Sequence, residues 1–155
     1  MKTGVREDKM SNLNSFDSFT MNERNGMSNF QWHVVGRGES IWNVVDTSDE
    51  KWPSEFSSWM DFWEKVTGLE FQSYCPVCGT KFLFEGKERN ANGAHVRLQN
   101  EPEDDMAWIM PLCSSCNNWQ TVGEMKLQGG TALVRTKMNK KHDTAKPELK
   151  KECGK

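Results

Sequence analysis

Residues 75–79 read Cys-Pro-Val-Cys-Gly, and residues 113–117 read Cys-Ser-Ser-Cys-Asn. In each stretch two residues separate the cysteines, a spacing that lets both sulfurs of a pair reach one metal ion. Two such pairs supply the four thiolates that a closed, tetrahedral structural zinc site needs. The sequence therefore predicts one structural Zn²⁺ ion, with iron or a redox-active dithiol as the alternatives. The predicted ligands are Cys75, Cys78, Cys113 and Cys116.

The composition of the whole chain is typical of a small intracellular protein with one hydrophobic core. Its 155 residues include 35% apolar side chains, and the formal net charge of −2 argues against a surface that coats nucleic acid or an anionic membrane. The N-terminus lacks the apolar stretch of a secretory signal, and no run of about 18 apolar residues occurs. We expect a reducing compartment, namely the cytoplasm, the nucleus or a virion, in which Cys153 stays free and no membrane is bound.

Shifts in composition divide the chain into four predicted segments. Residues 1–28 form a polar N-terminal arm that is too poor in large apolar side chains to fold alone. Residues 29–70 form a strand-helix extension packed on the core, and residues 71–134 form the four-cysteine zinc domain. Residues 135–155 form a basic C-terminal tail, since they hold eight Lys or Arg and only three Asp or Glu.

The extension shows the clearest pattern of secondary structure. Residues 30–45 predict two strands around a Gly-Arg-Gly loop at 36–38. A helix is expected to begin at Pro53 and Ser54 and to end at Gly68. Its apolar face repeats at helical spacing, which is typical of a core-facing stripe rather than a binding face. The stripe comprises Phe56, Trp59, Met60, Trp63 and Val66.

The zinc domain is expected to be built mainly from strands. Residues 81–85 and 94–98 predict a hairpin, and the apolar residues 107–112 lead the chain to the second cysteine pair. A short helix is expected after Cys116, and residues 124–127 and 132–134 predict a closing hairpin. The predicted fold class is α+β.

A knuckle, a hairpin and a second pair at a helix start resemble a treble-clef zinc finger. The stretch 74–118, under a third of the chain, resembles the zinc-bound form of the HNH, or ββα-metal, endonuclease domain. The resemblance rests on Gly-Ala-His-Val at 93–96 and Cys-x-x-Cys-Asn at 113–117, and small uncharacterised zinc proteins share both motifs. It implies a treble-clef core with His95 as general base and Asn117 near a Mg²⁺ or Mn²⁺ ion.

Two positions depart from the HNH pattern. Ala94 stands where the family usually places an acidic or His metal ligand, and Trp108 stands where it usually places Asn. An amide and one imidazole make a poor site for a hard cation, which prefers carboxylate oxygen. Carboxylates of the loop 103–105 would have to complete such a site. We therefore expect a binding or structural module rather than an enzyme.

Three functions stay open at this point. The first is a zinc-binding module that acts as a nucleic-acid-binding, in particular DNA-binding, or protein-binding component. The second is an HNH-like endonuclease, and the third is a non-catalytic subunit of a large assembly, such as a virion or a ribosome, if the tails are ordered. The candidate nucleic-acid contacts are Arg37, Lys137, Lys140, Lys141, Lys146, Lys150 and Lys151.

Overall fold

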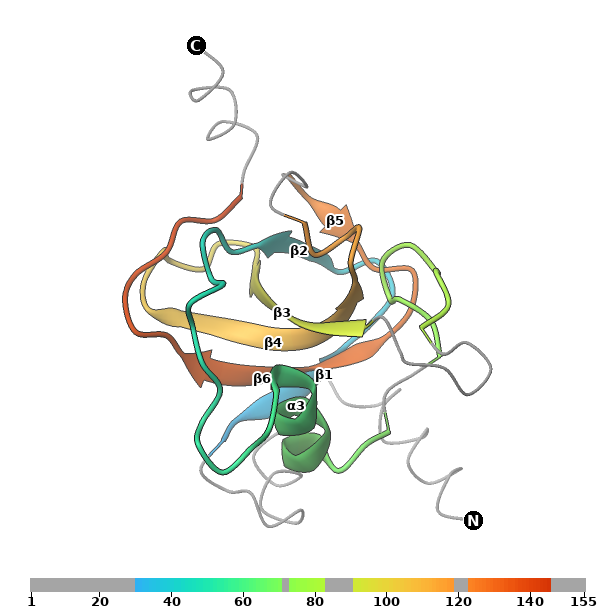
Figure 1. Ribbon diagram of the computed structural model, residues 1–155. Coiled ribbons are helices and arrows are strands. Elements are labelled where there is room, and N and C mark those ends of the chain that lie inside the picture. Colours follow the sequence, from blue (N-terminus) through green and yellow to red (C-terminus); the bar gives the residue numbers. More distant parts are fainter. Residues whose placement is uncertain (1–29, 71–72, 83–90, 119–122, 146–155) are drawn as a thin grey trace.

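The computed structural model describes residues 30–70, 73–82, 91–118 and 123–145, which form one helix and six strands (Figure 1). The elements are β1 (Trp32–Val35), β2 (Ser40–Asn43), α3 (Trp59–Thr67), β3 (Ala91–Leu98), β4 (Met106–Cys113), β5 (Met125–Lys126) and β6 (Thr131–Lys137). The described part of the chain is thus mostly β, which agrees with the predicted α+β class only in this broad sense. No helix among the described residues has the length and hydrophobicity to cross a bilayer.

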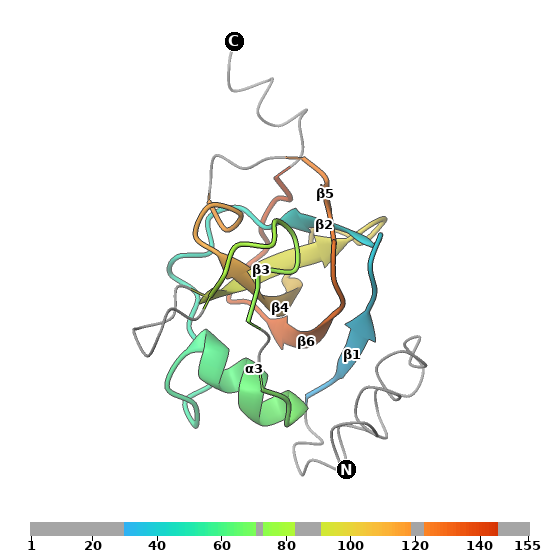
Figure 2. The same ribbon diagram turned by 90° about the vertical axis from the view of Figure 1, so that its right-hand side faces the viewer.

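The six strands form one antiparallel sheet in the order β1-β6-β4-β3-β2-β5. The longest pairing joins β3 to β4, from Ala91 opposite Cys113 to Val96 opposite Trp108. Helix α3 packs against β3, β4 and β6, and it lies on the opposite side of the molecule from β5 and β2 (Figures 1 and 2). The helix and the cysteines belong to two different core clusters.

Alternation along the strands divides the core between the two faces of the sheet. Ala94 and Val96 of β3 join Met110 of β4 in the cluster that contains the cysteines. Ile109 of β4 points the other way, into the cluster beneath α3. His95 lies between Ala94 and Val96 in the strand and therefore shares the helix-facing side.

Helix α3 ends where the sequence predicts, at Gly68, which adopts the left-handed conformation with φ 71°. It begins later than predicted, because Ser58 is the N-cap and its hydroxyl accepts a 2.9 Å hydrogen bond from Asp61 N. Pro53 instead starts a turn, in which Phe56 N donates to the Pro53 carbonyl.

The predicted apolar stripe of the helix is buried only in part. Trp63 and Val66 are fully buried, and the Trp63 indole donates to the Ala132 carbonyl at 2.8 Å. Trp59 and Met60, at the start of the helix, are only half-buried. Phe62, which the stripe did not include, is fully buried.

The predicted closing hairpin is wrong. Strand β5 pairs with β2, and β6 pairs with β4 and β1, so β5 and β6 are not neighbours. The described partners of β3 are β2 and β4 rather than residues 81–85, of which 83–85 lie outside the described residues. The helix expected after Cys116 also falls largely outside them, and residues 114–117 form turns.

The predicted basic tail begins too early. Arg135 and Lys137 belong to β6, and His142, Thr144 and Ala145 are buried against the body of the protein. The charge count of residues 135–155 gave no sign of this, because the buried side chains alternate with exposed lysines. The arm 1–28 and residues 146–155 lie outside the described residues.

Candidate metal centre and adjoining cavity

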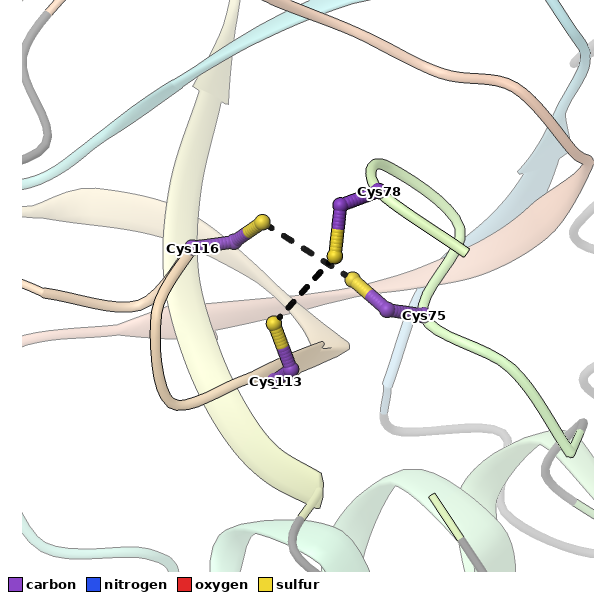
Figure 3. A group of neighbouring side chains, drawn as sticks. All are labelled: Cys75, Cys78, Cys113 and Cys116. Carbon is purple, nitrogen blue, oxygen red and sulfur yellow. Dashed lines mark hydrogen bonds between the residues drawn. The ribbon is translucent and has the colours of Figure 1, made fainter. Parts of the chain in front are cut away.

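The structure brings together the four cysteines of the two predicted pairs. Their sulfur atoms all lie within 4.8 Å of one another and point inward (Figure 3). The Sγ distances are 3.9 Å between Cys75 and Cys116 and 3.5 Å between Cys78 and Cys113. Zn–S bonds of about 2.3 Å in a tetrahedron would place the sulfurs about 3.8 Å apart. The cluster therefore has the donor number, donor type and size for one metal ion.

Both pairs are held in the same backbone turn. Gly79 N donates to the Cys75 carbonyl, and Asn117 N donates to the Cys113 carbonyl, each at 2.9 Å. Gly79 has a φ of 80°, which explains the glycine after the first pair. The two cysteine pairs therefore share this hydrogen bond, although the left-handed backbone at Gly79 has no counterpart at Asn117.

Each knuckle is anchored to a distant part of the chain. Gln128 N donates to the Pro76 carbonyl at 2.7 Å and so fixes the first knuckle. The buried Asn43 side chain of β2 donates to the Cys116 carbonyl at 2.8 Å and so fixes the second. The cluster thus joins the loop 73–82 to the end of β4 and to the strand β2.

Burial favours the neutral thiol at two of the four cysteines. Burial raises the pKa of the Cys113 and Cys116 thiols, and the neighbouring sulfurs raise that of Cys116 further. Burial also acts to raise the pKa of the exposed Cys78, but hydrogen bonds from Thr80 and the other thiols outweigh it and lower the pKa to about 7. A divalent ion would balance the negative charge and let all four thiols ionise.

His95 and Asn117, the two candidate catalytic residues, line one cavity of about 420 Å³. The cavity lies between the start of α3, the first half of β3 and the segment 47–52. His95 is 4% exposed, its ring lies 4.7 Å from that of Trp59, and its Nε2 atom has no hydrogen-bond partner among the described residues. Burial lowers the pKa of His95 to about 4, although Glu50 opposes the shift.

The positions that depart from the HNH pattern are core positions here. Ala94 is 1% exposed and faces away from His95, into the core cluster that contains the cysteines, here called the cysteine-side core. Trp108 packs beneath the Arg135 guanidinium at 4.7 Å and donates from its indole to Glu101. Neither position therefore adds a polar group to the cavity.

The acidic loop 103–105 does not complete a second metal site. Glu103 accepts from Thr144 N, Asp104 accepts from Met106 N, and Asp105 pairs with Lys137 at 3.6 Å. Among the described residues, the four cysteines are the only group of three or more His, Cys, Asp or Glu placed to hold a metal ion.

A buried ion pair beside the cavity escaped the sequence analysis. Glu50 Oε2 lies 2.8 Å from His142 Nε2, and Val45 O lies 2.8 Å from His142 Nδ1. Both ring nitrogens thus face oxygen atoms, so His142 ties Glu50 to the backbone at Val45. Burial acts to raise the pKa of Glu50, but hydrogen bonds from His142 and Asn139 N outweigh it and lower the pKa. Ninety-two positions separate the two residues in the sequence, so no local pattern could have revealed the pair.

Arg97 extends this buried network. Its guanidinium donates to the carbonyl groups of His142 and Asp104, at 2.8 and 2.7 Å, and to the Thr144 hydroxyl. Arg97 is 1% exposed and binds the segment after β6 to the sheet. This network is the physical reason why residues 138–145 are not part of a tail.

The described candidate nucleic-acid contacts do not form one patch. Arg37 is exposed in the loop after β1, near the end of the sheet where Val35 pairs with Thr131. Lys137 is exposed at the other end of the seven-residue β6, about 20 Å away. Lys140 and Lys141 are exposed just beyond Lys137. The remaining three, Lys146, Lys150 and Lys151, lie outside the described residues.

Comparison with known proteins adds no family to this geometry. No family model matches the chain, and no curated protein or solved structure matches it either. The candidate function therefore rests on the metal cluster and its surroundings.

Proposed function

We propose that the protein is a zinc-binding module whose four-cysteine site is structural and which acts as a nucleic-acid- or protein-binding component. The observation that carries the proposal is the cluster of four sulfurs within 4.8 Å. Four thiolates fill the coordination sphere of a tetrahedral Zn²⁺ ion and leave no position for a substrate. Zinc is favoured over an iron–sulfur centre because a structural role needs no redox change.

The surroundings of the cluster support a structural role. Cys75, Cys113 and Cys116 are buried within the cysteine-side core. A metal ion bound to them would hold this part of the core together in place of larger apolar side chains. The ion would join the loop 73–82 to the end of β4, whose cysteine sulfurs lie 3.5 to 3.9 Å from those of the loop.

A second candidate, the HNH-like endonuclease, is favoured by one observation. His95 and Asn117, which the resemblance assigns to catalysis, line the same cavity. The lowered pKa of about 4 counts against this role, because His95 is neutral near pH 7 but is a weaker base than an ordinary histidine. The candidate ranks second because the described residues offer no carboxylate or imidazole cluster for a Mg²⁺ or Mn²⁺ ion.

The assembly-subunit function has less support. The tryptophans of residues 30–63 would be its candidate interface residues, but Trp32 and Trp63 are each 1% exposed in the chain's own core. Its arm, residues 1–28, lies outside the described residues.

Elemental analysis of protein purified without added metal tests the proposal. We expect one zinc per chain, lost in Cys116→Ser and kept in Cys153→Ser. Binding is then measured by fluorescence anisotropy with labelled single-stranded and duplex oligonucleotides at several salt concentrations, since phosphate contacts weaken as salt rises. A chain without metal, or with iron in place of zinc, would contradict the zinc module.

A cleavage assay with Mg²⁺ or Mn²⁺ separates the two candidates. The zinc module predicts that neither wild type nor His95→Ala cleaves DNA or RNA. Metal-dependent cleavage that His95→Ala abolishes would instead establish the endonuclease.

A further inference from the structure

The cavity beside the second cysteine pair has the size and the lining of a ligand site. None of the four cysteines lines it. Ser48, Lys51 and Asn117 are exposed at its rim, while His95 is buried at its floor. Its volume of about 420 Å³ falls within the range of small-molecule sites, about 300–1,000 Å³. Asn117 follows Cys116 directly, so the zinc knuckle holds one side of the rim in place.

One wall of the cavity is aromatic. The rings of Trp52 and Trp59 lie 6.1 Å apart at 83°, and the Trp59 ring contacts that of His95. Both tryptophans are only half-buried, although the neighbouring Phe62 and Trp63 are fully buried. Half-buried tryptophans at a cavity offer ring surface on which a planar group can stack.

The polar groups that line the cavity suit a planar ligand with an uncharged hydrogen-bonding edge. A neutral imidazole offers one donor and one acceptor, and His95 Nε2 has no partner among the described residues. The exposed Asn117 amide offers a donor and an acceptor as well. Glu50 is not available, because Asn139 N and His142 engage its two carboxylate oxygens. No unpaired negative charge therefore opposes a ligand at this wall.

One lysine stands at the mouth of the cavity. The Lys51 ammonium lies 5.3 Å from the centre of the Trp52 ring, at the same rim. The start of α3 adds no free positive end, because the Asp61 carboxylate already accepts from Ser57 N there. A ligand with a planar ring and an adjoining anionic group would match the Trp52 ring and the Lys51 ammonium.

We propose that this cavity takes one unpaired base of a single-stranded nucleic acid, stacked on the Trp52 ring with its edge toward Trp59, and with the adjoining phosphate beside Lys51. A nucleobase has the flat face and the donor and acceptor edge that the wall and floor accept. This inference rests on the nucleic-acid form of the proposed function and names the unit that is recognised. It requires neither cleavage nor a second metal ion.

Two labelled strands test the base site by fluorescence anisotropy. One is a short single-stranded oligonucleotide, and the other has the same phosphates with abasic sugars throughout. We expect the base-bearing strand to bind about tenfold or more tightly than the abasic strand, as stacking of a base on an aromatic side chain predicts. Equal binding of both strands would overturn the base site and leave electrostatic nucleic-acid binding standing.

Two matched pairs of variants locate the site. Trp52→Leu removes part of the wall, and Trp42→Leu removes a half-buried tryptophan outside the cavity. Ser48→Leu narrows the mouth at an exposed position, and Ser54→Leu makes the same change elsewhere. We expect Trp52→Leu and Ser48→Leu alone to reduce the preference for the base-bearing strand to about one.

The remaining outcomes are also decisive. If folded Ser48→Leu protein keeps the full preference, bases bind elsewhere and the cavity is not the site. If neither strand binds the wild type, the base site and the nucleic-acid partner fail together, while the zinc result stands on its own.

Discussion

Gly93 of β3 lies directly against Trp59, the first residue of α3. A Cβ atom at Gly93 would collide with the Trp59 Cβ and lie 3.0 Å from its carbonyl carbon and 3.2 Å from Met60 N. The missing side chain therefore lets the start of the helix rest on the strand, and this contact brings the Trp59 ring over His95. A single glycine thus sets the position of the aromatic wall.

Gly93→Ala should lower the free energy of unfolding by about 3 kcal/mol, the upper end of the usual cost of overpacking, because backbone atoms oppose the new methyl group. Urea denaturation followed by circular dichroism measures the change. Gly36→Ala is the matched control, since a Cβ there meets nothing within 4 Å, and its effect should stay within about 1 kcal/mol. Equal effects of the two substitutions would show that α3 does not rest on Gly93.

Local signals explain what the sequence could predict. The spacing of the cysteines, the glycine after the helix and the apolar run of residues 107–112 each act over a few residues. Helix α3 therefore ends at Gly68 as expected, and the four cysteines lie together. The helix start was misplaced, because the prediction relies on Pro53 and Ser54, whereas the hydroxyl of Ser58 makes the cap.

Strand order and buried polar pairs could not be predicted in this way. Strand β5 pairs with β2, although the two strands lie far apart in the sequence. The pairing places Met125 beside Ile41 in the cysteine-side core. The partners Glu50 and His142 occur in polar stretches that read as solvated loops. Only the folded chain shows that Arg97 draws residues 142–144 inward.

Loss of the metal should remove cooperative folding. Zinc binding to such sites releases on the order of 10–16 kcal/mol that couples to folding, whereas a domain of this size is stable by only about 5–15 kcal/mol. Cys116→Ser, or treatment with a strong chelator, should therefore abolish the sigmoidal thermal transition followed by near-ultraviolet circular dichroism. Cys153→Ser should melt like the wild type. An unchanged transition in zinc-free protein would show that the core folds without the ion.

Substitution of His142 should lower the free energy of unfolding much more than substitution of its buried partner Glu50. His142→Ala should cost about 3–5 kcal/mol, because it leaves the Glu50 carboxylate buried and unpaired. Glu50→Gln should cost less than about 1 kcal/mol, because the amide can accept from Asn139 N and donate to a neutral His142 that donates to the Val45 carbonyl. Urea denaturation of both variants at pH 7.5 measures the difference. If Glu50→Gln proves as costly as His142→Ala, ionic attraction rather than hydrogen bonding holds the pair.

His95 should make the protein less stable as the pH falls from about 6.5 to about 4. Burial lowers its pKa from 6.5 to about 4, so in this window the unfolded chain binds a proton that the native chain does not. The difference corresponds to about 3 kcal/mol, lost progressively as the pH falls. His95→Phe keeps a ring against Trp59 and removes the titrating group, so its stability should fall by about 3 kcal/mol less over the same range.

The comparison of these two proteins isolates His95 from the other titrating groups. Burial also lowers the pKa of His33, and the affinity for zinc falls as the pH falls. Both effects are common to the wild type and His95→Phe. The difference between the two urea-denaturation profiles, measured from pH 4 to 7.5, therefore reports His95 alone. Parallel profiles would mean that His95 gains its proton in the native chain near its ordinary pKa. In that case the floor of the cavity would carry a positive charge in mildly acidic solution, and the neutral edge that a base requires would be present only at higher pH.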